Sequence, residues 1–440
     1  MTEALRHFIW QHRPFSLNGL RTAQGEEVEV IDPGLPNPHA GPDFFNAKVR
    51  LGGALWAGNV EMHVKASDWF AHGHHTDPRY NNVVLHVVVH ADRPALCAHG
   101  AEIPTLAIPY PSAMEARLNK LMDSEGRIPC HRHMQELDPF RQLAMLQRLM
   151  VERLQQKSEQ VLATVVRCKG SWEEAYYRAV VRCFGLKANA LPAELLAQSL
   201  PLTILGKHKN SPFQIEALLF GQSGLLHGPT PHPAGSYPAR LLSEHTFLAQ
   251  KYGLTPIDGA LWRFLRMRPS SFPTLRIAQL AALISQSTGL FSRSMEAPDL
   301  ESLEHLYTAT PSDFWHRHYT LGGKESPRST PKPIGRGLAH TIILNATVPF
   351  LFAHGRSRAI NGPCDKALHI LETMPPEANS VVDGFKKLGL TISSAADSQA
   401  AIHLKASRCD AKKCLHCEVG TAYLNDTPND TQTPHTQQNT

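Results

Sequence analysis

Four residues near the amino terminus have the types that metal-dependent hydrolysis of phosphodiesters uses: Asp43, Glu61, His63 and Lys65. Carboxylates hold a hard divalent cation, and a nearby imidazole or amine orients water and balances developing charge. Glu61, His63 and Lys65 alternate along the chain, so on a strand they share one face. Asp43 lies close to them only if the strand at residues 46–51 pairs with the strand at residues 55–65 through a hairpin. Asp43 and Glu61 are the predicted ligands of Mg²⁺ or Mn²⁺, and the alternative is a solvated face with surface ion pairs.

Histidines gather in the same stretch. Six of the 25 histidines fall close together, beside two aspartates: His63, His72, His74, His75, His86 and His90, with Asp68 and Asp77. Imidazole together with carboxylate suits zinc, manganese or iron. The HExxH spacing of zinc proteases is absent, and histidines on a loop surface are ordinary. The cluster therefore indicates either a transition-metal site or a polar loop.

Three cysteines near the carboxyl end have ligand spacing: Cys409-X4-Cys414-X2-Cys417. Thiolates at these intervals on a turn can converge on zinc or an iron–sulfur cluster. The fourth ligand is predicted to be Cys364, with His416 or His403 as nitrogen alternatives. Three reduced thiols without a metal are the other interpretation, and the remaining cysteines are expected in the core.

Arginines beside aromatic residues suggest a surface that grips nucleic acid. Arg266, Arg268 and Arg276 lie around the segment MRPSSFP, and guanidinium groups bind phosphates while rings stack on bases. A second basic group lies in the Gly- and Pro-rich segment 322–337 and comprises Lys324, Arg328, Lys332 and Arg336. A solvated, internally paired surface is the alternative for both groups.

The elements that must position Asp43 and Glu61 are predicted from residues 3 to 89. Residues 3–12 have helical spacing, and residues 27–31 alternate as a strand. Residues 46–51 and 55–65 are two further strands joined at Gly52-Gly53, a hairpin signal. A short helix follows, and residues 83–89 form a buried strand. The predicted order is helix, three strands, helix and strand.

Most of the remaining chain is predicted to be helical. Asp138-Pro139 begins a helix of about eight turns, because apolar residues recur at helical intervals as far as Val165. The sequence predicts five parts: an αβ domain at 1–112, a helical domain at 113–321, a basic linker at 322–337, a helical region with the cysteine cluster at 338–424, and a disordered tail at 425–440.

Composition sets broad bounds on the protein. A chain of 440 residues with 42% hydrophobic content can fill more than one core. The net charge of +5 permits a polyanionic partner such as nucleic acid but does not require one. We find neither a secretory signal pattern nor an apolar run of ~18 residues. We therefore expect a cytoplasmic protein without a membrane span.

The amino-terminal stretch resembles the core of PD-(D/E)XK nucleases. The resemblance rests on the Pro42-Asp43 turn, the strand-borne segment from Glu61 to Lys65, the helix after it and the apolar strand at 83–89. It implies a restriction-endonuclease-like αβ domain followed by a mainly α-helical domain, with magnesium held by the acids and a lysine near the attacked phosphate. That family has its second acid two residues before the lysine, where this chain has His63. Either Glu61 holds the metal with His63 in the lysine's role, or His63 is a ligand and Lys65 keeps its role.

The whole chain also resembles a bacterial family known only as domain of unknown function 2851. The similar segments are GPDFFNA, WAGNVEMHVKASDW, YNNVVLHVV, MRPSSFP and the terminal CX4CXXC. That resemblance implies no established activity. The leading hypothesis is a metal-dependent nuclease or nuclease-derived DNA-processing protein. The alternatives are a noncatalytic nucleic-acid-binding protein that keeps the fold, and a small-molecule metallohydrolase that uses the histidine cluster.

Overall fold

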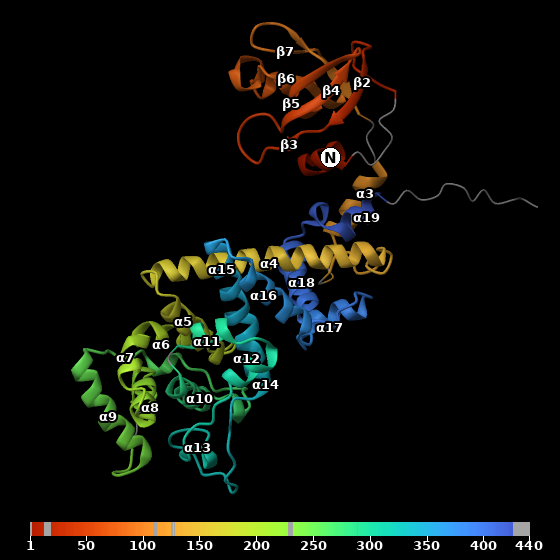
Figure 1. The fold of residues 1–440 in the computed structure, drawn as a ribbon. Coiled ribbons are helices and arrows are strands. Elements are labelled where there is room, and N and C mark those ends of the chain that lie inside the picture. The colour runs from red at the N-terminus through yellow and green to blue at the C-terminus, as the bar shows by residue number, and fades with distance from the viewer. Residues whose placement is uncertain are drawn as a thin grey trace, which may run out of the picture. The chain divides into compact units, whose positions relative to one another are not determined.

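The computed structural model describes residues 2–12, 19–108, 112–124, 126, 128–227, 232–287 and 289–425 (Figure 1). They form two compact units, which are described separately. The first unit contains the residues up to Met145, Lys387–Leu390 and those from Leu404 onward, and the second contains Leu146–Lys386 and Thr391–His403. The predicted αβ start and mostly helical carboxyl half are confirmed. Of the predicted tail, residues 426–440 lie outside the described part.

The first unit is built around a mixed sheet. Its strands are β1 Leu20–Arg21, β2 Glu27–Asp32, β3 Leu35–Pro36, β4 Phe44–Leu51, β5 Ala54–Lys65, β6 Val83–His90 and β9 Thr105–Ala107, in the order β1-β2-β4-β5-β6-β9 with β3 beside β4. Strands β2, β4 and β5 are an antiparallel meander, whereas β6 runs parallel to β5 and β9 parallel to β6. Strands β7 Ala95–Leu96 and β8 Glu102–Ile103 pair separately.

Short helices complete this αβ part. Helix α1 Glu3–His12 precedes the sheet, as its helical spacing predicts. Strand β5 is joined to β6 through α2 Asp68–Ala71 and two 3₁₀ turns, η1 His74–Thr76 and η2 Pro78–Tyr80. The predicted order of helix, three strands, helix and strand is therefore present, with β1 and β3 as short additions. Two parallel neighbouring strands need a crossover connection, and the connection from β5 to β6 carries His72 and His74.

The two faces of β5 have different neighbours. Met62 belongs to the main core, which α1 also covers. Glu61 and His63 point to the opposite face and are only 5% and 4% exposed, because Trp69 of α2 and the residues around it cover them. These two polar side chains are therefore not on a solvated surface. Lys65, at the end of the same face, is exposed.

A β-bulge separates Asp43 from the regular part of β4. The register moves from Phe44 opposite Val60 to Ala47 opposite Gly58, so β4 has one extra residue there. The extra residue lies near Asn46, whose φ of 55° is a left-handed conformation that asparagine tolerates. The bulge thus re-aims the start of β4, where Asp43 lies.

Helices make up most of the rest of the described chain: α3 Ser112–Met122, α4 Pro139–Arg167, α5 Trp172–Phe184, α6 Ala190–Ser199, α7 Leu202–Lys207, α8 Pro212–Gln222, α9 Tyr237–Tyr252, α10 Pro273–Gln286, α11 Leu290–Glu296, α12 Leu300–Leu306, α13 Phe314–Arg317, α14 Arg336–Ile342, α15 Val348–Arg358, α16 Asn361–Thr373, α17 Ser380–Lys387, α18 Ala395–Leu404 and α19 Glu418–Asn425. Helix α4 is the long helix predicted after Asp138, whose Oδ1 accepts the amide N–H groups of Phe140 and Arg141. The boundary between the two units falls inside α4.

One described helical stretch, Arg336–Arg358, is long and apolar enough to cross a membrane by length and composition. It comprises α14, the π-helical turn η5 Ile343–Thr347 and α15. Its most apolar window is 72% buried inside the protein. Such burial is typical of a core helix that is apolar on most sides.

The close packing of β5 against the start of β6 leaves no room for a side chain at Gly58. A Cβ there would lie 2.3 Å from Val84 Cγ1 and 2.8 Å from the carbonyl oxygen of Asn82. We expect Gly58→Ala to lower the free energy of unfolding by about 1–3 kcal/mol, because overpacking forces the backbone to shift. Urea unfolding measures this as a lower midpoint at unchanged slope.

The matched control is Gly322→Ala, an exposed position outside the helices and strands where a Cβ would meet no atom within 4 Å. Its midpoint should stay within about 0.5 kcal/mol of wild type, as expected for an open surface position. Equal destabilisation by both substitutions would contradict the packing argument.

Candidate metal centre

Asp43 and Glu61 meet at the junction of β4 and β5. The backbone N–H of Asp43 donates to Glu61 Oε2 at 3.1 Å, and Asp43 Oδ2 accepts the N–H of Met62 at 3.0 Å. The hairpin thus brings together two carboxylates that are far apart in the sequence. Asp43 is half-buried and Glu61 is buried.

Three imidazoles surround the other side of the Glu61 carboxylate. Glu61 Oε1 lies 3.6 Å from His63 Nε2 and 3.3 Å from His74 Nε2. His63 Nε2 is also 3.1 Å from His72 Nδ1, and one ring nitrogen from each of the three histidines lies within 4.8 Å of the others. His72 is exposed, so the cluster opens to solvent on its side. Glu61, His63, His72 and His74 are therefore placed as a group of metal ligands would be.

His86 supports His63 from the neighbouring strand. The parallel register sets Glu61 opposite His86, and His63 Nδ1 lies 2.9 Å from His86 Nε2. His86 is fully buried, and Trp69 packs on its ring at 5.2 Å between centroids. His75 and His90, also part of the predicted cluster, lie away from these ligands: His75 packs on Phe70, and His90 lies at the end of β6 opposite Lys65.

Burial governs the protonation of this site. Burial, followed by the charges of neighbouring histidines, lowers the pKa of His63 to about 3, and burial with His74 lowers the pKa of His86 to about 4. Burial also raises the pKa of Glu61, although His74 acts in the opposite direction. Both histidines are thus neutral at neutral pH, which is the form that binds metals.

A second group of possible ligands lies beside the first and includes residues that sequence reasoning missed. Oxygen or nitrogen atoms of Glu3, His7 and Asp43 all lie within 4.8 Å of one another, and His7 Nε2 is 3.2 Å from Asp43 Oδ1. Glu3 and His7 are one turn apart on α1, so they share a helix face. That spacing is a signal, but only the packing of α1 against the sheet shows that the face meets Asp43.

Ring nitrogens of these two groups face carboxylate oxygens. His7 Nε2 lies 3.2 Å from Asp43 Oδ1 and His74 Nε2 lies 3.3 Å from Glu61 Oε1, whereas the buried Nδ1 of the neighbouring His86 has no hydrogen-bond partner. A buried carboxylate oxygen and a ring nitrogen this close need a proton or a cation between them. The donor set of carboxylates and neutral imidazoles fits Mn²⁺, Zn²⁺ or Fe²⁺. The side chains of Glu61, His63 and His74 would hold such an ion.

Lys65 lies apart from these ligands. Its side chain is exposed at the end of β5, while its backbone N–H donates to Asp68 Oδ2 at 3.0 Å. It shares the face of Glu61 and His63, as alternation requires. Lys65 is therefore placed to attract an anion at the rim and not to contact a buried cation.

The predicted cysteine group falls into different parts of the chain. Cys409, Cys414 and Cys417 are buried in the first unit, whereas Cys364 belongs to the second unit, in α16, and its Sγ donates to the carbonyl oxygen of Phe352 at 3.6 Å. Cys130, taken from the sequence as a core residue, is a buried member of the first unit. Its pKa is raised by burial and then by the charges of Cys417, Cys409 and Cys414.

The predicted nucleic-acid-binding arginines differ in exposure. Arg266 and Arg268 are exposed in the loop before the 3₁₀ turn η4 Pro269–Ser271. Arg276 is half-buried in α10, its Nη1 donates to Gln279 Oε1 at 2.9 Å, and burial lowers its pKa. Arg266 and Arg268 therefore present their guanidinium groups to solvent, whereas Arg276 is engaged within the helix.

Two residues of the predicted basic linker are also engaged inside the second unit. Lys332 Nζ donates to the carbonyl oxygens of Trp315 and His316, the latter at 2.7 Å. Arg336 Nε donates to Glu304 Oε1 at 2.9 Å. Helix α14 begins at Arg336, so the linker and the predicted C-terminal helical region join there.

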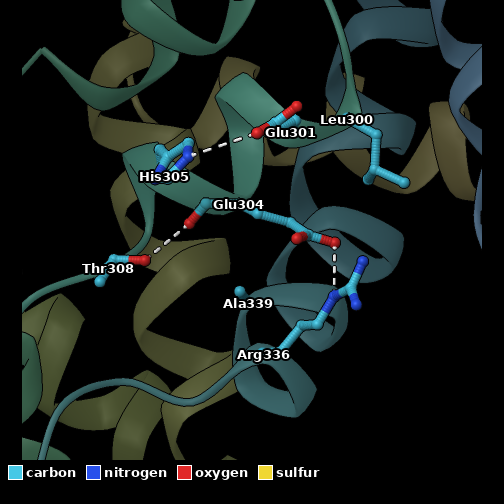
Figure 2. Close-up of a pocket in the computed structure, with 7 residues that line it drawn as sticks. All are labelled: Leu300, Glu301, Glu304, His305, Thr308, Arg336 and Ala339. Carbon is cyan, nitrogen blue, oxygen red and sulfur yellow. Dashed lines mark hydrogen bonds and ion pairs between the residues drawn. The ribbon is translucent and has the colours of Figure 1, made fainter.

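A hollow of about 560 Å³ lies beside Arg336 and is shown in Figure 2. Its lining comprises Leu300, Glu301, Glu304, His305, Thr308, Arg336 and Ala339. Burial acts to raise the pKa of Glu304, but hydrogen bonds from His340 and Arg336 outweigh it and lower that pKa. The Glu304 carboxylate is thus ionised and already paired, so we assign the hollow no role.

Fold and site together define a mixed α/β protein with a buried carboxylate–histidine cluster on its sheet. The chain belongs to the family described as "Protein of unknown function (DUF2851)", whose model matches residues 3–380. The matched part contains both ligand groups and Cys130 but ends before Cys409. No curated protein and no solved structure matches the chain. Its function therefore has to be argued from the site.

The neutral histidines predict a pH-dependent stability for the metal-free protein. An unfolded histidine takes up a proton near pH 6.5, whereas His63 and His86 do so near 3 and 4 when folded. Between these values the unfolded chain binds more protons, so stability is present above pH 6.5 and is lost as the pH falls. For His86 the loss should reach about 2–3 kcal/mol at pH 4.5. Urea unfolding of chelator-treated protein from pH 7 to 4.5 measures it.

The variant His86→Gln should show a shallower pH dependence, because one titrating group is gone. His305→Gln is the matched control, since the His305 side chain is 78% exposed and should leave the slope unchanged. A slope in His86→Gln as steep as in wild type would show that His86 does not set this dependence.

Proposed function

We propose that this protein is a metal-dependent phosphodiesterase that cleaves nucleic acid. The observation that carries the proposal is the junction of Asp43 and Glu61 on paired strands, with His63 and His74 within 3.6 Å of the same Glu61 oxygen. Support also comes from the order of helix, three strands, helix and strand, which is the order expected for a PD-(D/E)XK core. A likeness in fold does not establish a function, so the function is inferred from the residues of the site.

The protein groups divide into two roles. A divalent cation, when bound, activates water for attack and offsets negative charge on the phosphoryl oxygens. Glu61, His63 and His74 would hold it, with Asp43 at its side. A histidine whose pKa is about 3 is a poor base near neutral pH, so His63 is better suited as a ligand. Of the two roles left open by the sequence, we favour Lys65 as the cation that faces the phosphate.

Cleavage assays test this function directly. Wild-type protein should cut single-stranded, duplex or branched DNA with Mg²⁺ or Mn²⁺ and lose that activity with a chelator. Glu61→Gln should lower the rate by about 100-fold or more, the scale seen when a group at the reacting centre is removed. The readout is product formation over time on gels.

The matched control is Glu29→Gln, a carboxylate on β2 whose side chain is 65% exposed and pairs with Arg50. Its rate should equal that of wild type, since exposed ion pairs contribute little. Absence of cation-dependent cleavage on all three substrates would refute the enzymatic proposal.

The exposed arginines provide a separate test of nucleic-acid binding. We expect the double substitution of Arg266 and Arg268 by Ala to weaken DNA binding about tenfold or more at 50 mM salt and to reduce the salt dependence of affinity, because phosphate contacts release counterions. Fluorescence anisotropy measures both. Arg276→Ala is not a control here because it removes an internal hydrogen bond, so Arg317→Ala, an exposed arginine on α13, serves instead. Unchanged affinity in the double variant would exclude this surface.

A second candidate function is favoured by the mutual approach of His63, His72 and His74. Three imidazoles beside one carboxylate also suit a zinc or iron hydrolase of small molecules. This candidate predicts activity on chromogenic small esters or phosphodiesters while DNA is left intact. The activity should disappear in His74→Ala but not in His305→Ala.

A further inference from the structure

Four buried cysteines of the first unit lie on two segments that are distant in the sequence. Cys130 lies in the loop between α3 and α4. Cys409 ends the π-helical turn η6 Lys405–Cys409, Cys414 begins the 3₁₀ turn η7 Cys414–His416, and Cys417 directly precedes α19. Their exposed fractions are 4%, 7%, 7% and 5%. All four are free thiols.

Direct contacts hold the two segments together. The ring of His133, three residues after Cys130, stacks on Tyr423 of α19 with 3.8 Å between centroids. Lys412 Nζ donates to the carbonyl oxygen of Met122 at the end of α3. These contacts place the loop that carries Cys130 against the segment that carries the other three buried thiols.

The carboxyl-terminal segment is bent so that its three thiols converge. Lys412 has a φ of 48°, a left-handed conformation that is strained for lysine, and its N–H donates to the carbonyl oxygen of Cys409 at 3.1 Å. The N–H of Cys417 donates to the carbonyl oxygen of Cys414 at 3.3 Å. Gly420 is needed for this fold, because a Cβ there would lie 2.1 Å from the carbonyl oxygen of Cys414.

The protein also provides hydrogen bonds for a thiolate at this place. Burial raises the pKa of Cys417, and the backbone N–H groups of Gly420 and Val419, in the first turn of α19, act against this by donating to its sulfur. Amide donors at a helix start stabilise negative charge, and such bonds tune metal-bound thiolates. Arg408 adds a nearby positive charge, and its Nε donates to the carbonyl oxygen of His416 at 3.0 Å.

The distances between the cysteine sulfurs distinguish a single zinc ion from an iron–sulfur cluster. A zinc ion with Zn–S bonds of about 2.3 Å would hold its four sulfurs about 3.8 Å apart. Among these four described cysteines, no three sulfur atoms lie within 4.8 Å of one another. An iron–sulfur cluster keeps its cysteine sulfurs further apart, because irons and sulfides lie between them.

We propose that Cys130, Cys409, Cys414 and Cys417 are the four ligands of one iron–sulfur cluster. Each thiol loses its proton when the cluster binds, so four thiolates replace four buried thiols. The cluster joins the loop before α4 to the segment that carries α19, and thereby closes the first unit. This inference does not depend on the proposed nuclease activity, and its test does not use activity.

Metal analysis of the full-length protein, purified without oxygen, tests the proposal. Wild type should contain about two or about four irons per chain with an equal number of acid-labile sulfides, and show the broad visible absorption of a cluster. Cys130→Ser should lose most of the iron and the absorption. Cys364→Ser is the matched control, because it also removes a single cysteine, and it should retain both.

The outcomes that would overturn the proposal are specific. One zinc per chain without iron, or no metal at all in wild type, would refute the cluster. Iron retained in Cys130→Ser at the wild-type level would refute the fourth ligand. If Cys130→Ser is insoluble, Cys417→Ser and the iron and sulfide content of wild type decide, since a wild-type protein without iron contradicts the proposal in any case.

Discussion

The first unit depends on the burial of one carboxylate. Glu61 is 5% exposed in the middle of β5, and a carboxylate removed from water must be protonated, paired or coordinated. The elements around it supply partners: β4 brings the N–H of Asp43, and the connection from β5 to β6 brings His74. The hairpin, the bulge and the parallel crossover all converge on this carboxylate.

Burial also keeps the imidazoles of His63 and His86 neutral. His63 Nδ1 lies 2.9 Å from His86 Nε2, and neither ring can take up a second proton at neutral pH without placing a positive charge in the interior. A cluster of imidazoles beside carboxylates is the kind of donor set that transition metals bind. The cluster opens to solvent only at the exposed ring of His72, among the four residues Glu61, His63, His72 and His74.

The carboxyl-terminal segment gives the first unit a second point of closure. Residues from Leu404 onward return to the unit that contains the amino terminus, although the helical second unit separates them in sequence. Closing so long a loop costs chain entropy, and a small group of local contacts offsets little of it. A shared metal centre among Cys130, Cys409 and their two partners would offset that cost in one place, as structural metal sites do.

Local patterns in the sequence determined the elements and several of the residues in the site. Strand alternation placed Glu61 and His63 on one face, and the Gly52-Gly53 signal predicted the β4–β5 hairpin that brings Asp43 to them. The cap at Asp138 and the helical spacing after it predicted α4. Such features depend on neighbours within a few residues, so they can be derived without the fold.

Only the tertiary structure decided which of those residues are buried and which distant ones join them. Trp69 covers the Glu61 face, α1 brings His7 to Asp43, and Cys130 belongs to the same unit as the three carboxyl-terminal cysteines while Cys364 belongs to the other. These meetings depend on sheet register and on which helix covers which face, and no periodicity within one segment encodes them. The sequence by itself determined that an acid and a histidine, Glu61 and His63, share one face of β5. The tertiary structure decided that both side chains are buried, because the segment between β5 and β6 covers that face.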